Sequence, residues 1–129
     1  MILVRDAMVS DVVLVDIETT LKETCRVMGE KHIGSVLITR NGKMEGIFTE
    51  RDLLSKVILK GVDMEKSRVG DYMATPLTVI RSDYELKEAA RAMAQLRVRR
   101  LPVIDNGRLV GIVTSADIVK AIAEAPLEI

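Results

Sequence analysis

Apolar and polar positions follow the same order in the two halves of the chain. Each half has an apolar run rich in β-branched residues, then apolar residues spaced i, i+3, i+4 and i+7. Two apolar runs on either side of an Asn-Gly pair follow, and a second stretch of helical spacing ends the half. Short β-branched runs are typical of buried strands, and the i, i+3, i+4, i+7 spacing places apolar side chains on one face of a helix. The pattern therefore predicts the element order β-α-β-β-α, written twice.

The predicted elements can be placed by residue number. Strands are predicted at residues 12–15, 36–39 and 44–48 in the first copy and at residues 77–80, 101–104 and 109–113 in the second. The first helix of each copy has the apolar face Leu21, Thr24, Cys25 and Met28, or Leu86, Ala89, Ala90 and Met93. The closing helices have the apolar residues Leu53, Leu54, Val57 and Ile58, or Ile118, Val119, Ile122 and Ala123.

Turn and cap signals mark the ends of these elements. Asn41-Gly42 and Asn106-Gly107 favour type I′ hairpin turns, because both central residues of that turn need a positive φ. Thr20-x-x-Glu23 and Ser82-x-x-Glu85 predict capping boxes near the starts of the two first helices.

The two copies align without a gap at a displacement of 65 residues. Both Asn-Gly pairs and both Thr-x-x-Asp strings fall in this one register. We therefore expect an α/β fold of two repeats, at residues 4–59 and 69–124, joined by a polar linker at residues 60–68. A three-stranded sheet with helices on one face cannot cover its own apolar surface well, so we expect the copies to pack about a pseudo-two-fold axis, with two clefts between them.

Composition excludes several classes of protein. The 129 residues are 48% apolar and carry 19 basic and 19 acidic side chains, which argues for a compact domain and against disorder. General nucleic-acid binding is disfavoured, because the chain lacks a basic excess and only 2% of its residues are aromatic. No apolar run approaches the ~20 residues of a membrane helix. A single cysteine and an early charged amino end lead us to expect a cytoplasmic protein.

The Thr-x-x-Asp strings lie where a strand is expected to run into a helix. They read Gly-Ile-Phe-Thr-Glu-Arg-Asp at residues 46–52 and Gly-Ile-Val-Thr-Ser-Ala-Asp at residues 111–117. One interpretation is a capping box alone, in which the hydroxyl and the carboxylate satisfy the helix start. The other is a nucleotide site, because a helix N-terminus attracts phosphate and a carboxylate can accept bonds from adjacent ribose hydroxyls.

Arginine is concentrated at one place in the second copy. Arg97, Arg99 and Arg100 precede a predicted strand, and the first copy has no such cluster. A solvated charged face is one interpretation; a phosphate contact is the other, because guanidinium binds phosphate in bidentate fashion. Pro102 within the strand removes a donor from the ladder and favours an edge or a bend.

Catalytic and metal signals are missing from the sequence. His32 is the only histidine, and it has no Cys, His or carboxylate partner at ligand spacing. The chain has no nucleophile elbow, Walker loop or Gly-x-Gly-x-x-Gly motif. Cys25 lies at a helical core position, so we read it as a packing residue. We therefore expect a binding module and neither an enzyme nor a metal site.

The repeat and its motifs resemble the CBS family, named after cystathionine β-synthase domains, which occur in tandem as a Bateman module. The resemblance covers residues 4–124 and rests on the two Thr-x-x-Asp strings and on the run Arg-Arg-Leu-Pro-Val-Ile-Asp-Asn-Gly at residues 99–107. It implies a regulatory module that binds an adenosine-containing ligand such as AMP, ADP, ATP, S-adenosylmethionine or NADH, with no obligatory cofactor. It also implies a homodimer of modules that acts on a separate partner protein.

The resemblance also implies roles for individual residues. Asp117 and Asp52 match the residue that holds the ribose hydroxyls, Thr114 and Thr49 match the hydroxyl beside the phosphate, and Arg99 and Arg100 match the basic pair that contacts it. The adenine walls match the surroundings of Thr78 and Pro102, and those of Val13 and Leu37. Leu101 and Ser35 are also expected among the nucleotide-binding residues. The family site draws on both copies, so we expect removal of either half to abolish binding.

The two copies differ at several matched positions. Gly34-Ser35 stands where the second copy has Arg99-Arg100, and Leu37 and Val13 stand where it has Pro102 and Thr78. We therefore expect unequal sites, with the site around Asp117 the stronger. Three alternatives stay open: an adaptor or oligomerisation module indifferent to nucleotide, a sensor of S-adenosylmethionine or NADH, and a nucleic-acid contact through the cluster from Arg97 to Arg100.

Overall fold

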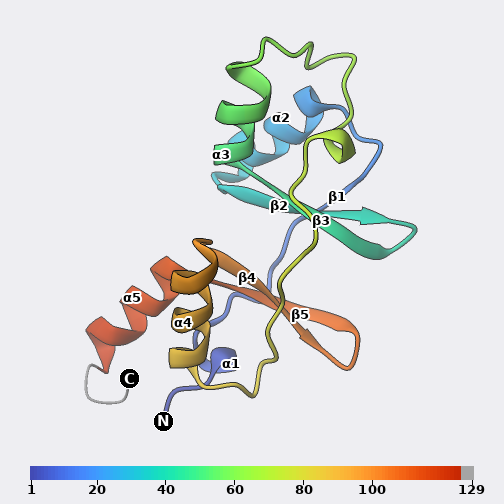
Figure 1. Ribbon diagram of the computed structural model, residues 1–129. Helices are drawn as coiled ribbons and strands as arrows, with labels where there is room; N and C mark the ends of the chain where they lie inside the picture. The colour runs from blue at the N-terminus through green and yellow to red at the C-terminus, as the bar shows by residue number, and fades with distance from the viewer. Residues whose placement is uncertain (126–129) are drawn as a thin grey trace. The chain divides into compact units, whose positions relative to one another are not determined.

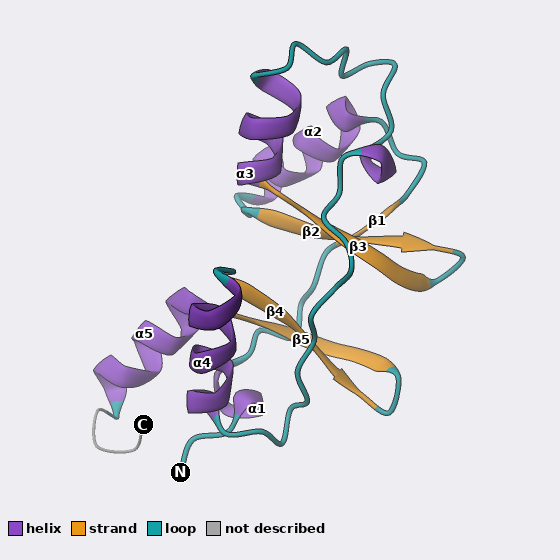
Figure 2. Ribbon diagram, viewed as in Figure 1, coloured by secondary structure: helices purple, strands orange, loops and turns teal. Residues whose placement is uncertain are grey.

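The computed structural model describes residues 1–125, which form two compact units. Unit 1 contains Met1–Val12 and residues 78–125, and unit 2 contains Val13–Leu77. Figures 1 and 2 show a small sheet and a group of helices in each unit. No helix of the described residues is long and apolar enough to cross a bilayer.

Unit 2 is built on a three-stranded sheet in the order β1-β2-β3. Its elements are β1 (Leu14–Asp16), α2 (Leu21–Lys31), β2 (Ser35–Arg40), β3 (Lys43–Thr49), α3 (Glu50–Asp52), the π-helix η1 (Leu53–Ile58) and the 3-10 helix η2 (Val69–Asp71). β1 pairs parallel with β2, and β2 pairs antiparallel with β3. Buried residues of the helices, such as Leu21 and Val57, pack with Val36 and Phe48 of the strands to form the core.

Unit 1 has a two-stranded sheet. Its elements are α1 (Val4–Ala7), α4 (Leu86–Leu96), β4 (Arg100–Asp105), β5 (Arg108–Thr114) and α5 (Ser115–Glu124). β4 and β5 pair antiparallel, and the core combines Leu86 and Met93 of α4 and Ile118 of α5 with Leu101 and Val113 of the strands. The two copies therefore keep the same order of helices and hairpin but differ in the number of strands.

The strand predicted at residues 77–80 is the element that did not form. Only Ile80 pairs there, in an isolated parallel bridge to Val103. In unit 2 the Leu37 N–H donates to the Val13 carbonyl at 3.2 Å, which extends the contact between the first and second strands. Pro102 occupies the position equivalent to Leu37 and has no N–H to donate, so the matching bond to Thr78 cannot form. The first-copy strand, predicted at residues 12–15, lies two residues later than its predicted start.

The lead-in of each repeat, which is the segment before its first predicted strand, packs in the unit that holds the other repeat. Val4 of α1 is fully buried in the core of unit 1 with Leu86, and Val69 of η2 is fully buried in the core of unit 2 with Leu21. Residues 60–68, read from the sequence as a polar linker, lie within unit 2, where Val62 and Met64 pack against the core. The chain passes between the units at residues 12–13 and 77–78.

Local turn signals are confirmed. Asn41 and Gly42 have φ values of 51° and 79°, and Asn106 and Gly107 have φ values of 51° and 76°, as a type I′ turn requires.

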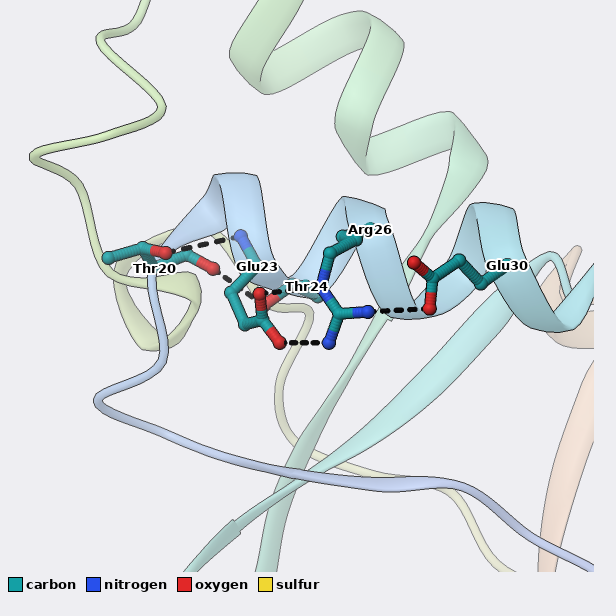
Figure 3. Close-up of polar contacts among 5 residues, drawn as sticks. All are labelled: Thr20, Glu23, Thr24, Arg26 and Glu30. Atoms are coloured by element: carbon teal, nitrogen blue, oxygen red, sulfur yellow. Dashed lines mark hydrogen bonds and ion pairs between the residues drawn. The ribbon is translucent and has the colours of Figure 1, made fainter.

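The helix-start signals have mixed outcomes. Thr20 caps α2, since its hydroxyl oxygen accepts from the Glu23 N–H at 3.1 Å, and Arg26 pairs along the exposed face with Glu23 and Glu30 (Figure 3). The cap predicted at Ser82 is wrong: Glu85 is the N-cap residue of α4 and makes no side-chain cap bond. The Ser82 hydroxyl donates instead to the Asp105 carboxylate.

Candidate functional site

The second Thr-x-x-Asp string forms a closed capping box at the start of α5. Asp117 Oδ2 accepts from the Thr114 N–H at 2.8 Å and from the Thr114 hydroxyl at 2.9 Å. The Thr114 oxygen in turn accepts from the Asp117 N–H at 3.2 Å. These bonds fix the carboxylate at the helix start through one of its two oxygens, Oδ2. The cap leaves the second oxygen, Oδ1, out of its hydrogen bonds.

The first string forms the same box at the start of α3. Asp52 Oδ2 accepts from the Thr49 N–H at 3.0 Å and from the Thr49 hydroxyl at 3.1 Å, and the Thr49 oxygen accepts from the Asp52 N–H at 3.3 Å. The capping interpretation of both strings is therefore confirmed as a structural role. A cap of this form does not exclude a ligand, because it uses only one carboxylate oxygen.

One ion pair distinguishes the two boxes. Lys56 Nζ lies 3.1 Å from Asp52 Oδ1, the oxygen that the cap leaves unused, and Lys56 also donates to the Tyr72 carbonyl at 3.3 Å. Ala121 occupies the position equivalent to Lys56 in the second copy. The sequence interpretation missed Lys56, although its i, i+4 spacing from Asp52 is the signal that predicts such a pair on a helix.

The hairpins bring the first residues of β2 and β4 to the two helix starts. Arg100 lies opposite Thr114 in the β4–β5 pair, and Ser35 lies opposite Thr49 in the β2–β3 pair. Residues directly opposite one another share a face of the sheet, so Arg100 and Thr114 project from the same face. The first N–H of α5, on Ser115, donates to the Arg99 carbonyl at 2.8 Å, which ties the arginine pair to the helix start.

The remaining residues assigned to the site have different surroundings. Val13 and Leu37 are neighbours through the bond between their backbones, and Leu37 is buried. Thr78 is exposed and Pro102 is buried. Leu101, on the opposite face of β4 from Arg100, has its side chain in the core of unit 1, so only its backbone is available to a ligand.

Arg97, His32 and Cys25 have local structural roles. Arg97 and His32 end α4 and α2 in the left-handed conformation, with φ values of 56° and 54°. Cys25 is half-buried, and burial raises the pKa of its thiol. Within residues 1–125 no three His, Cys, Asp or Glu side chains are grouped closely enough to hold a metal ion.

Comparison with known proteins identifies the family. The CBS domain model matches residues 4–59 and 69–124. Protein MK0525 of Methanopyrus kandleri is 42% identical over 104 residues, which are 78% of this chain and 53% of that protein. The chain thus spans about half the length of this relative.

Solved structures share the fold. The hexameric CBS-CP12 protein from bloom-forming cyanobacteria is 30% identical with a TM-score of 0.88, and the match covers 97% of this chain and 71% of that one. The CBS domain pair of protein MJ0100, solved with 5′-methylthioadenosine and S-adenosyl-L-methionine, has a TM-score of 0.83 at 24% identity; the match covers 93% of this chain and 98% of that one. CBS pairs are regulatory ligand-binding modules. The sequence repeat, the paired capping boxes and these matches together show that the chain belongs to the CBS domain family.

Proposed function

We propose that this protein is a regulatory module that binds an adenine nucleotide of the AMP, ADP or ATP class and passes the signal to a partner protein. The observation that carries the proposal is the arrangement at the start of α5. Thr114 and Asp117 are fixed there by their mutual hydrogen bonds, and the arginine pair is tied to the same turn through the Arg99 carbonyl.

Asp117 is the proposed ribose contact. Its Oδ2 is held by Thr114, so the carboxylate has a fixed orientation before a ligand arrives. Its Oδ1 is then the oxygen that accepts from a ribose hydroxyl, and a bond to a charged acceptor is stronger than one between neutral groups. Asp52 has the same relation to Thr49 and is the matching residue of the first copy.

The phosphate is proposed to lie at the helix N-terminus beside the arginines. α5 is a regular helix of 10 residues, so its first turn carries the positive end of a helix dipole. Arg99 and Arg100 add positive charge from the adjoining strand, and guanidinium groups suit phosphate oxygens. In the first copy Gly34 and Ser35 supply no charge, and α3 gives way to a π-helix after three residues.

Adenine is proposed to contact the backbone around Thr78, Leu101 and Pro102. Because Pro102 cannot donate to the Thr78 carbonyl, that carbonyl has no ladder donor from β4 and is suited to accept from an exocyclic amino group. At the corresponding place in unit 2, the Val13 carbonyl is already bonded to Leu37. The first-copy wall of Val13 and Leu37 is therefore the weaker candidate.

The proposal includes a homodimer of modules in the cytoplasm. The closing helices of both copies expose large apolar side chains, with Leu54 and Ile58 in one and Val119 and Ile122 in the other. A related protein of the family is hexameric, so association between copies is a property found among the relatives. The exposed apolar side chains of the closing helices are the surface that we assign to this contact.

A thermal-shift screen tests the proposal. A ligand that binds only the folded state stabilises it by RT ln(1 + [L]/Kd), so AMP, ADP, ATP, NADH, S-adenosylmethionine and 5′-methylthioadenosine are compared on the wild type. We expect AMP, ADP or ATP to raise the melting temperature, and Asp117→Ala and Arg100→Ala to abolish the shift. Asp83→Ala removes an exposed carboxylate of the same unit and is the matched control.

The same screen separates the alternatives. A shift with S-adenosylmethionine or NADH alone would assign the site to those ligands. No shift with any compound, together with a stable oligomer, would favour the adaptor interpretation. Binding to an oligonucleotide that weakens steeply with salt and depends on Arg97, Arg99 and Arg100 would favour a nucleic-acid contact.

A further inference from the structure

Lys56 forms an ion pair with Oδ1 of Asp52, the carboxylate oxygen that a ribose hydroxyl would contact. We propose that Lys56 closes the first copy of the site, so that the chain holds a single nucleotide, at Asp117. The proposal rests on the proposed function, because it assumes that the two aspartates are the ribose contacts. It adds a residue, outside the two capping strings, that decides which copy binds.

Both oxygens of Asp52 are engaged inside unit 2. Thr49 holds Oδ2 through its N–H and its hydroxyl, and Lys56 Nζ lies 3.1 Å from Oδ1. The Asp52 side chain is 10% exposed and that of Lys56 is 43% exposed, so the carboxylate is largely shielded while the lysine reaches it from the solvent side. A carboxylate whose two oxygens already have partners has no strong acceptor position left for a diol.

Lys56 is anchored at a second point. Its ammonium group donates to the Tyr72 carbonyl at 3.3 Å, and Tyr72 follows η2 and packs against the core of unit 2. This contact spans sixteen residues of sequence, whereas an ordinary surface pair on a helix has no such tether. The ammonium is thus held between a carboxylate and a carbonyl, which favours the closed arrangement over one with Lys56 in solvent.

The second copy has no lysine at the position equivalent to Lys56. Ala121 stands at the position equivalent to Lys56 and has no charge to offer Asp117. Asp117 is also less buried than Asp52, and α5 continues as a regular α-helix where α3 becomes a π-helix. A ligand at Asp52 must displace the ammonium group of Lys56, whereas the alanine at the equivalent position of the second copy presents no such group to Asp117. Because the Lys56 side chain is 43% exposed and solvent screens part of the attraction, we expect displacement to lower affinity roughly tenfold.

Titration calorimetry with 5′-AMP on the full chain tests the proposal. We expect one AMP per wild-type chain, lost in Asp117→Ala. Lys56→Met keeps the aliphatic stem and removes the charge, and we expect it to bind two AMP per chain, with the added site lost in the double variant Lys56→Met/Asp52→Ala. Ala121→Lys places the same lysine beside Asp117, and we expect it to weaken AMP binding at least tenfold relative to Ala121→Met, which controls for bulk.

The outcomes separate this proposal from the proposed function. One Asp117-dependent site in the wild type, with no gain in Lys56→Met, overturns the closure by Lys56 and leaves the proposed function intact. Two sites in the wild type, one of them lost in Asp52→Ala, also overturn it. Binding that appears only in Lys56→Met and depends on Asp52 supports the closure and rejects Asp117 as the site. If neither the wild type nor Lys56→Met binds AMP, both the closure by Lys56 and the proposed function are rejected. Should Ala121→Lys fail to fold, as circular dichroism would show, the Lys56→Met result decides.

Discussion

Ser82 is bonded to Asp105 through both its backbone and its side chain. The Ser82 N–H donates to Asp105 Oδ1 at 3.0 Å, and the Ser82 hydroxyl donates to Oδ2 of the same carboxylate. Asp105 is the last residue of β4, and Ser82 follows the segment that failed to form a strand beside it. The pair therefore fastens residues 80–82 to the sheet of unit 1 where ladder hydrogen bonds are few.

This pair should make stability depend on pH. The hydrogen bond from the Ser82 hydroxyl, and secondly the one from its backbone N–H, lower the pKa of Asp105 below its ordinary value. A carboxyl whose pKa is lowered by folding stabilises the protein above its unfolded pKa of about 3.9, and this contribution is lost as the pH falls through the lower folded value. We expect Ser82→Ala to lower the free energy of unfolding at neutral pH and to have a smaller effect at about pH 3.

Urea unfolding of the wild type and of Ser82→Ala at both pH values measures the difference. Ser115→Ala, which alters an exposed serine of the same unit, is the control. An effect of Ser82→Ala that is equal at both pH values would show that its loss of stability does not come from the charged carboxylate.

Thr114 should contribute to folding as well as to binding. Its side chain closes the capping box of α5, so Thr114→Ala is expected to lower the free energy of unfolding by about 0.5–2 kcal/mol. Thr114→Ser keeps the hydroxyl and is expected to stay close to the wild type. Urea unfolding monitored by circular dichroism compares them. An equal loss of unfolding free energy in both variants would assign the effect to the threonine methyl group and not to the cap.

Gly46 and Gly111 should tolerate no side chain. A Cβ at Gly46 would lie 2.7 Å from the Ala74 carbonyl oxygen, and one at Gly111 would lie 2.8 Å from the Val9 carbonyl oxygen. Both oxygens belong to the backbone of segments that pair with β3 and β5. They cannot move without breaking the bridges between Ala74 and Ile47 and between Val9 and Ile112. We expect Gly46→Ala and Gly111→Ala each to destabilise by about 1–3 kcal/mol.

Gly29 provides the matched control for these two substitutions. It lies in α2 with nothing within 4 Å of its added Cβ, and alanine has the better helix propensity. Gly29→Ala is therefore expected to stabilise by about 0.5–1 kcal/mol. The three melting curves measured side by side give the comparison. Gly46→Ala at wild-type stability would show that the bridge to Ala74 adapts.

The exposed apolar side chains of the closing helices should govern association. Leu54 and Val119 occupy equivalent positions and are 63% and 66% exposed. We expect Leu54→Glu and Val119→Glu to shift the proposed dimer to monomer in light scattering coupled to size exclusion, because each variant would bury a charged carboxylate if the contact formed. Leu96→Glu, on an exposed apolar residue of α4, is the control and should leave the dimer unchanged.

The repeat, the helices and both hairpins could be predicted from the sequence, because each depends on contacts between nearby residues. Asn41-Gly42 and Asn106-Gly107 fix their turns through backbone conformations that few other residues adopt. The Thr-x-x-Asp strings likewise close within one helical turn, so their hydrogen bonds follow from spacing. Assignment of ribose, phosphate and adenine contacts to these residues stays a prediction.

Contacts between distant segments were decided only by the tertiary structure. Val4 and Val69 are similar lead-in residues, yet nothing local indicates that each is buried in the unit that holds the other repeat. Residues 77–80 have the composition of a strand, but strand formation needs a donor at residue 102, where proline has none. Lys56 reaches Tyr72 because η2 packs into unit 2. Spacing along the chain determines turns, caps and helix faces, whereas strand pairing and long-range side-chain contacts depend on which segments the cores bring together.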